Sequence, residues 1–370
     1  MSRKLIYRNR ALCFVLFLFS FPYRFAARNL PEAEESTAKA TQIIHVSNST
    51  WHDFSRLVDV QIGSHVNGVS ELKRYLHRFG YVNDGSESFS DVFDGPLESA
   101  ISLVIRTLQM ANILVVLGLP ITGRLDTSTV SLMSLPRCGV SDTHMIINND
   151  VIHTTAHYTY FNGKPKWNRD TLTYAISKTH KLDYLTLEDV KTVFRRAFSQ
   201  WSSVIPVSFE EVDDFSAADL KIGFYAGDHG DGLPFDGVLG TLAHAFAPEN
   251  GRLHLDAAET WVVDDDFKGS SEVAVDLESV ATHEIGHLLG LGHSSQESAV
   301  MYPSLRPRTK KVDLTVDDVA GVLKLYGPNP KLRLDSLTQS EDSIKNGTVS
   351  HRSLAGNFIG FIFCWLLFCF

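Results

Sequence analysis

HEIGHLLGLGH, residues His283–His293, is the stretch that decides the fold of this 370-residue chain. Residues four apart lie one above the other on a helix, so the side chains of His283 and His287 can both point at one metal ion. Gly290 lets the chain leave the helix through a backbone angle that other residues rarely adopt, and the turn brings His293 round as a third ligand. Imidazole nitrogens suit zinc, and three protein ligands leave a fourth position open to water, which is the arrangement of a catalytic zinc site.

Glu284 lies beside the first of these histidines and completes the chemistry. Its carboxylate can take a proton from the water, while zinc lowers the pKa of that water and polarises a peptide carbonyl. Met301 follows in the sequence VMYP, residues 300–303, where a methionine turn beneath the zinc is expected. The alternative is a surface helix with scattered histidines, and the agreement between the eleven-residue spacing and the methionine disfavours it.

The segment resembles the zinc motif of the metzincin peptidases, and Ser294 after the third histidine is similar to the matrix metalloproteinase branch. A second motif, PRCGVSD at residues 136–142, resembles the cysteine switch in the propeptide of that branch, with Ser141 where the family usually has proline. The resemblance covers about residues 53–330. It implies an α+β fold, in which a twisted, mostly parallel five-stranded sheet with three helices follows a small three-helix prodomain of the peptidoglycan-binding-like type.

The switch motif gives Cys138 a specific role. The resemblance implies that its thiolate binds the catalytic zinc of the latent precursor in the place of water, and that Arg137 and Asp142 pair to pin the loop. The other cysteines, Cys13, Cys364 and Cys369, lie in terminal apolar segments, so a processed chain would hold no internal disulfide. The alternative for Cys138 is an ordinary buried free thiol.

The resemblance also implies metals that stabilise the fold. Three histidines and a carboxylate close a tetrahedral shell around a structural zinc, and the matching residues are His229, Asp231, His244 and His254. Calcium prefers hard oxygen ligands, and the matching residues are Asp236, Asp256 and Glu259, with the backbone oxygens of Gly237, Leu239 and Thr241. Asp219 resembles a ligand of a further calcium site. Without the resemblance, the histidines are equally consistent with an ordinary polar surface.

The two ends of the chain read as processing signals. Residues 1–27 combine a basic stretch, an apolar run and small residues, which is typical of a cleaved secretory signal; the alternative is a membrane anchor. At the other end, a polar spacer precedes the apolar residues 355–370, a pattern typical of a lipid (GPI) anchor signal attached near Asn346–Ser350. The alternative there is a plain helical anchor. Asn48 and Asn346 begin glycan acceptor sequences.

These features predict the organisation of the chain. We expect a signal peptide at 1–27, a propeptide at 28–142, a connector at 143–165, a catalytic domain at 166–330, a linker at 331–350 and a removed tail at 351–370. Apolar spacing predicts a helix that ends at Gly80 and a strand over 172–176, and capping residues predict helices that begin after Thr186 and Thr315. The apolar stretch 104–116 is longer than the resemblance leads us to expect.

Taken together, the motifs predict a secreted zinc endopeptidase that acts on extracellular proteins or peptides, requires two zinc ions and calcium, and is held as a monomer on the outer face of the plasma membrane. The missing propeller domain and the tail resemble a plant-type member of the family. The formal charge is −9, and removing residues 1–27, with five basic and no acidic residues, makes it −14. This charge argues against a nucleic-acid partner. The alternatives are a polysaccharide-binding module, a metzincin of another branch, and an inactive zinc protein.

Overall fold

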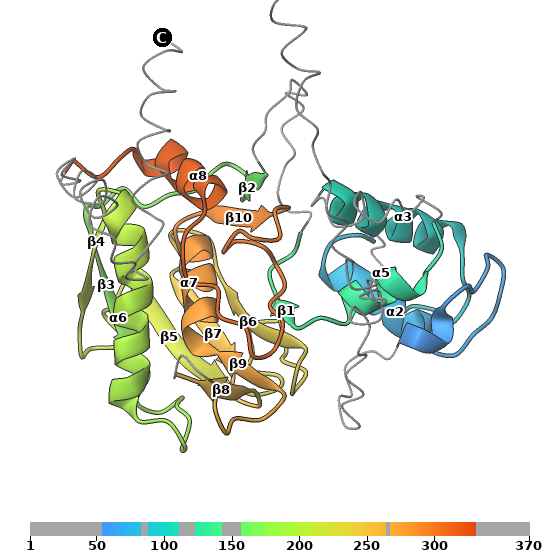
Figure 1. The fold of residues 1–370 in the computed structure, drawn as a ribbon, viewed down its shortest axis with the longest axis horizontal. Helices are drawn as coiled ribbons and strands as arrows, with labels where there is room; N and C mark the ends of the chain where they lie inside the picture. The colour runs from blue at the N-terminus through green and yellow to red at the C-terminus, as the bar shows by residue number, and fades with distance from the viewer. Residues whose placement is uncertain (1–53, 83–87, 111–122, 143–156, 264–266, 331–370) are drawn as a thin grey trace, which may run out of the picture. The chain divides into compact units, whose positions relative to one another are not determined.

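The computed structural model describes residues 54–82, 88–110, 123–142, 157–263 and 267–330 (Figure 1). The predicted signal peptide, the glycan sites Asn48 and Asn346, the linker, the anchor signal and most of the connector lie outside the described residues. The same is true of residues 111–116 in the long apolar stretch. Among the described residues, no helix is long and apolar enough to cross a membrane.

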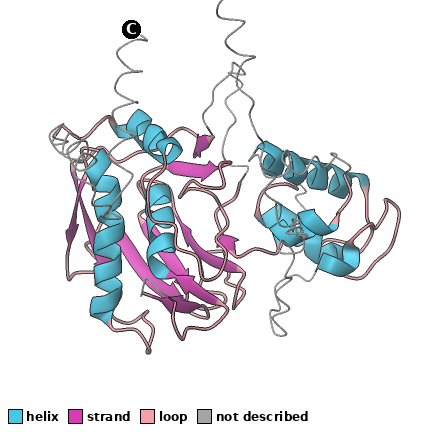
Figure 2. Cartoon of the chain, viewed as in Figure 1, coloured by secondary structure: helices cyan, strands magenta, loops and turns pink. Residues whose placement is uncertain are grey.

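A sheet, magenta in Figure 2, lies beneath the helices of the catalytic region. It has six strands in the order β1-β6-β7-β5-β3-β4. Its strands are β1 Arg137–Cys138, β3 Thr171–Ile176, β4 Ser208–Glu211, β5 Leu220–Tyr225, β6 Thr241–Ala245 and β7 Arg252–Asp256. All neighbours are parallel except β6 and β7. The predicted mostly parallel five-stranded sheet therefore corresponds to β3–β7. The sixth strand, β1, comes from the switch motif and was not expected.

Two long helices lie side by side over one face of this sheet (Figure 1). Helix α6, Leu187–Val204, begins at Thr186, whose hydroxyl accepts a hydrogen bond from the Asp189 amide at 3.1 Å. Its buried face includes Trp201, whose indole N–H donates to the carbonyl of Thr282 in α7, Leu277–Leu288, at 2.9 Å. Complete burial of Trp201 and this bond hold α7 against the core, so the zinc motif lies on a rigid element.

Helix α8, Val316–Tyr326, closes the domain and has the predicted ends. Thr315 and Asp318 form a reciprocal capping box at its start, and Gly327 ends it with a φ of 75°. Nearby, β2 Tyr158–Tyr160 pairs antiparallel with β10 Leu291–Ser294.

Strand β2 shows that the last part of the predicted connector, residues 143–165, is structured. It lies in the range expected to be a connector, but its backbone pairs with the strand that carries His293, and the Tyr160 hydroxyl donates to Gly321 O of α8 at 2.9 Å. Tyrosine favours strands because its ring packs well on a half-buried pleated surface. Residues 157–160 therefore pack with the strand that carries His293, although they precede the predicted start of the catalytic domain. A further small sheet pairs β8 Thr260–Val262 with β9 Ala274–Asp276 in parallel.

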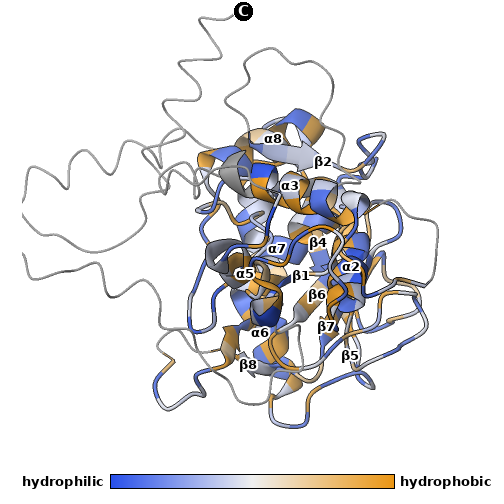
Figure 3. Cartoon of the chain, turned by 90° about the vertical axis from the view of Figure 1, so that its right-hand side faces the viewer, coloured by the Kyte–Doolittle hydropathy of each residue, from blue (hydrophilic) through white to orange (hydrophobic). Residues whose placement is uncertain are grey.

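The residues predicted to form the propeptide make a helical module with a hydrophobic core of its own. Its elements are η2 Phe54–Leu57, α2 Val69–Arg78, α3 Gly95–Met110 and α5 Thr127–Met133. Figure 3 shows polar and apolar residues alternating around α2 and α3, and the apolar sides form a core of their own that includes Leu72, Leu76 and Leu97. Helix α2 ends two residues before Gly80, close to the predicted helix end. Residues 111–122 of this module lie outside the described part of the chain, so the three-helix prodomain stays a prediction.

Candidate active site

Helix α7 holds the first two histidines in matching orientations. Asp276 caps the helix by accepting the Ser279 amide at 2.7 Å. One turn apart, the Nε2 atoms of His283 and His287 lie 3.1 Å from each other. Their Nδ1 atoms are turned away toward the carbonyls of Val300 and Leu291, at 2.7 and 2.8 Å. A bond of this kind fixes which ring nitrogen faces a metal.

Gly290 turns the chain toward the third histidine. Its φ is +100°, and an added Cβ would lie 2.2 Å from the carbonyl oxygen of Pro165, so only glycine fits without a shift of the backbone. The chain then enters β10, which places the His293 ring 5.3 Å from that of His283 and 4.8 Å from that of His287, centroid to centroid. The predicted turn at Gly290 is confirmed.

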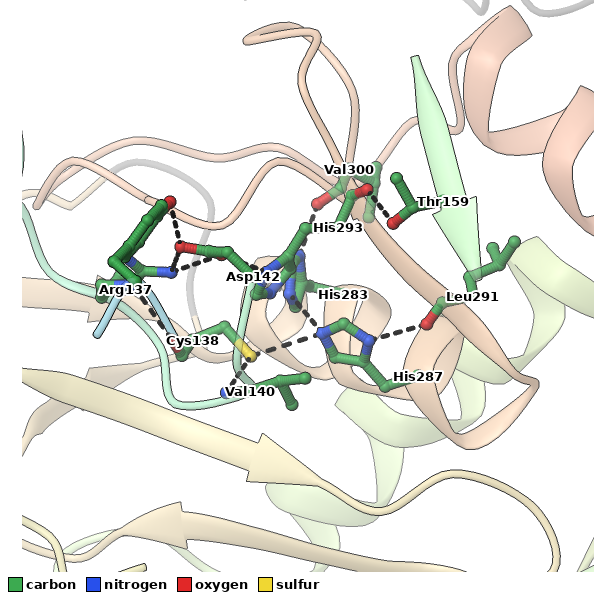
Figure 4. A network of polar contacts seen from close by, with 11 residues as sticks. Arg137, Cys138, Val140, Asp142, Thr159, His283, His287, Leu291, His293 and Val300 are labelled. Carbon is green, nitrogen blue, oxygen red and sulfur yellow. Dashed lines mark hydrogen bonds and ion pairs between the residues drawn. The ribbon is translucent and has the colours of Figure 1, made fainter. Parts of the chain in front are cut away.

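One ligand atom each from Cys138, His283, His287 and His293 gathers within 4.8 Å, and all four residues are buried (Figure 4). The Cys138 Sγ lies 3.4 Å from His287 Nε2. Burial lowers the pKa values of His283 and His287 and raises that of the Cys138 thiol. The imidazoles are therefore neutral, and the thiol would ionise only beside a cation. Such a set of four donors fits tetrahedral zinc.

Glu284 is fully buried and points into the same space. Its two carboxylate oxygens accept no hydrogen bond from the described residues. Burial raises the pKa of Glu284 to about 8, and the nearby Cys138 thiol partly opposes that effect. A carboxylate that exchanges its proton near neutral pH is suited to general acid–base chemistry.

A cavity extends from Glu284 and Cys138 to Lys311. Its walls are mostly apolar and include Val280 and Tyr302. At the far end, the Lys311 ammonium donates to the carbonyls of Glu297 and Ala299 at 3.1 Å each, and burial lowers its pKa to about 8.

The methionine turn is held by α8, through a residue whose role at the site is not visible in the sequence. Met301 is fully buried, and the amides of Val300 and Met301 donate to the Asp318 carboxylate at 2.9 and 3.0 Å. The neighbouring Asp317 accepts the Ser294 hydroxyl at 2.7 Å and the His157 amide at 2.8 Å. The capping pattern marked Asp318, but only as the start of a helix.

The switch motif crosses the site as strand β1. The Cys138 amide donates to Pro303 O at 2.8 Å, and the Gly139 amide donates to Ala243 O at 2.8 Å, so the strand lies between β6 and the segment after Met301. A Cβ on Gly139 would lie 2.5 Å from the Thr241 methyl group, which explains the glycine. Arg137 and Asp142 form the expected pair, with Nη2 2.7 and 2.8 Å from the two carboxylate oxygens. Although burial opposes the effect, the Arg137 guanidinium lowers the pKa of Asp142.

A second cluster brings together His229, Asp231, His244 and His254. Strands β6 and β7 place His244 opposite His254, and Asp231 Oδ2 lies 2.8–3.0 Å from a nitrogen of each ring. Burial lowers the pKa values of His244 and His254 to about 4, so both rings are neutral at pH 7. Three imidazoles and one carboxylate match the donor set of a closed zinc site.

The predicted calcium carboxylates lie around one loop. The amides of Gly237, Leu239 and Thr241 donate to Asp256, Glu259 and Asp236, respectively. Asp236 Oδ2 and Glu259 Oε2 are buried without a hydrogen-bond partner among the described residues. Burial raises the pKa values of Asp236 to about 6 and of Glu259 to about 8. Buried acidic oxygens with no donor fit a bound cation.

Asp219 has different surroundings. Its Oδ1 forms an ion pair with Arg169, and its Oδ2 accepts the Thr173 amide and hydroxyl at 2.9 Å. The carboxylate oxygens of Asp219, which the resemblance predicts to bind calcium, are therefore bonded to the Arg169 guanidinium and the Thr173 hydroxyl. The geometry gives that prediction no support.

Three imidazoles around one point, a buried carboxylate beside them and a cavity at that position define a metallopeptidase site. Comparisons with known proteins agree. Residues 166–327 match the matrixin family. The chain is 90% identical over 363 residues to metalloendoproteinase 1-MMP of Arabidopsis thaliana, covering 98% of this chain and 97% of that protein. It is 52% identical over 305 residues to metalloendoproteinase 4-MMP of the same plant, covering 82% and 83%.

A more distant relative is matrix metalloproteinase-20 of Homo sapiens, 42% identical over 215 residues, which is 57% of this chain and 40% of that protein. The chain belongs to the matrixin family and, by its relatives, to the plant matrix metalloproteinases. It is a zinc metalloendopeptidase.

Proposed function

We propose that the chain is a latent, secreted precursor whose mature form cleaves internal peptide bonds of extracellular proteins, with Glu284 as general base. The observation that carries the proposal is the convergence of His283, His287 and His293 beside Glu284, which has a raised pKa. The three histidines would hold the catalytic zinc. When bound, that ion supplies Lewis-acid polarisation of the scissile carbonyl and makes water more acidic.

Residues of the chain would transfer the proton and bind the substrate. Glu284 takes the proton of the attacking water and can pass it to the leaving amine, because its carboxylate lies next in the helix to a zinc-ligating histidine and burial raises its pKa. The apolar cavity that ends at Lys311 receives a substrate side chain.

Latency is proposed to come from the switch segment. Cys138 lies where a fourth zinc ligand belongs, and β1 uses the free edge of β6 and the Pro303 carbonyl. A substrate backbone could bind these same groups, so the segment would block both the metal and the groove. Arg137 and Asp142 keep the loop in place through a buried ion pair.

The remaining assignments are part of the same proposal. A structural zinc at His229, Asp231, His244 and His254, and calcium at Asp236, Asp256 and Glu259, would replace disulfides as the source of rigidity. The names of the relatives speak of matrix metalloproteinases, which is consistent with extracellular action. Lipid anchoring to the outer leaflet rests on the sequence pattern of the tail.

The test compares Glu284→Ala with Glu272→Ala, whose side chain is 81% exposed. Both proteins are activated, their zinc is measured by mass spectrometry, and the hydrolysis of a quenched peptide is followed with and without a chelator. We expect Glu284→Ala to keep its zinc and to lose about 10²–10⁴-fold in turnover, while the control stays at the wild-type level. Near-full turnover of zinc-loaded Glu284→Ala would show that another group is the base.

A further inference from the structure

His293, the third histidine of the site, differs from the other two in the group that its Nδ1 atom contacts. The Nδ1 atoms of His283 and His287 contact backbone carbonyls that belong to the catalytic domain itself. The Nδ1 atom of His293 instead lies 2.8 Å from the Asp142 carboxylate, which comes from the propeptide (Figure 4). A segment that is removed on activation thus supplies one of the three contacts that orient the metal ligands.

Asp142 is well suited to this contact because it is fixed from several sides. Arg137 binds both of its oxygens, and the Tyr81 hydroxyl donates to Oδ2 at 2.7 Å. The Asp142 amide donates to Phe79 O at 3.2 Å, and the Arg137 guanidinium lies 3.7 Å from the centre of the Phe79 ring. The carboxylate side chain is only 7% exposed, so it is a rigid, charged acceptor.

A carboxylate that accepts the Nδ1 proton affects the imidazole more strongly than a backbone carbonyl does. Accepting the Nδ1 proton fixes the tautomer in which Nε2 faces the metal, and the negative charge makes the imidazole a stronger ligand. Hydrogen bonds to ionised acceptors are roughly twice as strong as those to neutral ones. Loss of such a contact typically weakens metal binding by about 10–100-fold.

We propose that Asp142 is a positioning residue for the catalytic zinc, so that the propeptide strengthens the metal site that it blocks. This rests on the proposed function, in which the three histidines bind zinc and the switch segment keeps the precursor latent. The propeptide is then attached to the site at two points, through the Cys138 thiol and through the bond between Asp142 and His293. Activation removes both, and the mature enzyme holds its zinc less tightly than the precursor.

The experiment uses the full precursor and measures zinc loss rather than activity. Zinc transfer to a chromogenic chelator is timed for wild type, Asp142→Asn and Tyr81→Phe. The last variant removes one bond to Asp142 but leaves the contact with His293 intact. We expect about 10–100-fold faster loss from Asp142→Asn and a rate near wild type for Tyr81→Phe. In nitrogen-15 spectra of the histidines, the His293 Nδ1–H signal should report a weaker hydrogen bond in Asp142→Asn than in wild type, because an amide oxygen accepts without a negative charge.

A second precursor, which lacks the Cys138 thiol, separates the effect of the Asp142–His293 contact from that of the thiol on zinc. Asp142→Asn is also made in a Cys138→Ala precursor, where the thiol no longer contributes, and the same acceleration over Cys138→Ala alone is expected. If Asp142→Asn lost zinc no faster than its parent protein in either background, the proposal would be overturned. Failure of the proposed function would look different, because the wild-type precursor would then lack the zinc or leave Cys138 open to thiol reagents.

Discussion

Replacing Gly290 by alanine tests whether the turn after α7 positions the third zinc ligand. The residue has a φ of +100°, and an added Cβ would lie 2.2 Å from Pro165 O and 3.5 Å from a Leu325 methyl carbon. The oxygen belongs to the backbone, so it cannot move aside as a flexible side chain would. The chain must shift at the point where it carries His293 toward the metal.

The size of the effect follows from two costs. A left-handed backbone angle costs an ordinary residue about 1–2 kcal/mol, and overpacking in a filled site adds about 1–3 kcal/mol. Gly290→Ala should therefore lower the free energy of unfolding by about 2–5 kcal/mol. For a domain of this size each kcal/mol corresponds to about 2–4 °C, so the melting temperature should fall by roughly 4–20 °C.

Gly163 provides the matched control. Its φ is +82°, but no atom lies within 4 Å of an added Cβ, so Gly163→Ala incurs only the backbone cost of about 1–2 kcal/mol. Thermal unfolding of both mature variants is followed by circular dichroism at fixed zinc and calcium, together with zinc content. Equal melting temperatures for the two variants, with full zinc in both, would refute the clash at Pro165 and the role given to the turn.

The other predictions concern latency, calcium and anchoring. A Cys138→Ser precursor should cleave peptides without an activator, because a hydroxyl is a poor zinc ligand; a folded, zinc-loaded variant that stays latent would contradict the switch. Calcium chelation at fixed zinc should lower the melting temperature. In the chelated protein, the pKa values of Asp236 and Glu259 are raised to about 6 and about 8. The unfolded state then binds fewer protons than the folded state, so the free energy of unfolding falls as pH rises from about 4 to 8. A melting temperature indifferent to calcium would argue against the site. A phosphatidylinositol-specific phospholipase should release the mature protein from cells, and an intact peptide containing Trp365 in that protein would favour a helical anchor.

The local features of the site could be predicted from the sequence alone. The i, i+4 spacing of His283 and His287 places both rings on one helix face, and Gly290 supplies the left-handed turn. The capping box at Thr315 and Asp318 marks the start of α8. Each of these depends on a few consecutive residues, because helix geometry and backbone angles are set by near neighbours.

Contacts between distant segments were decided only by the tertiary structure. Sequence periodicity does not show that Cys138 would join β6 as a sixth strand, or that Tyr158–Tyr160 would pair with β10. The carboxylate of Asp142 reaches His293 across 151 positions of the chain, and Asp318 reaches the Met301 amide only after α8 packs beneath the turn. Such bonds form because folding buries polar groups that must then find partners, and which partner is near enough depends on how the strands and helices pack.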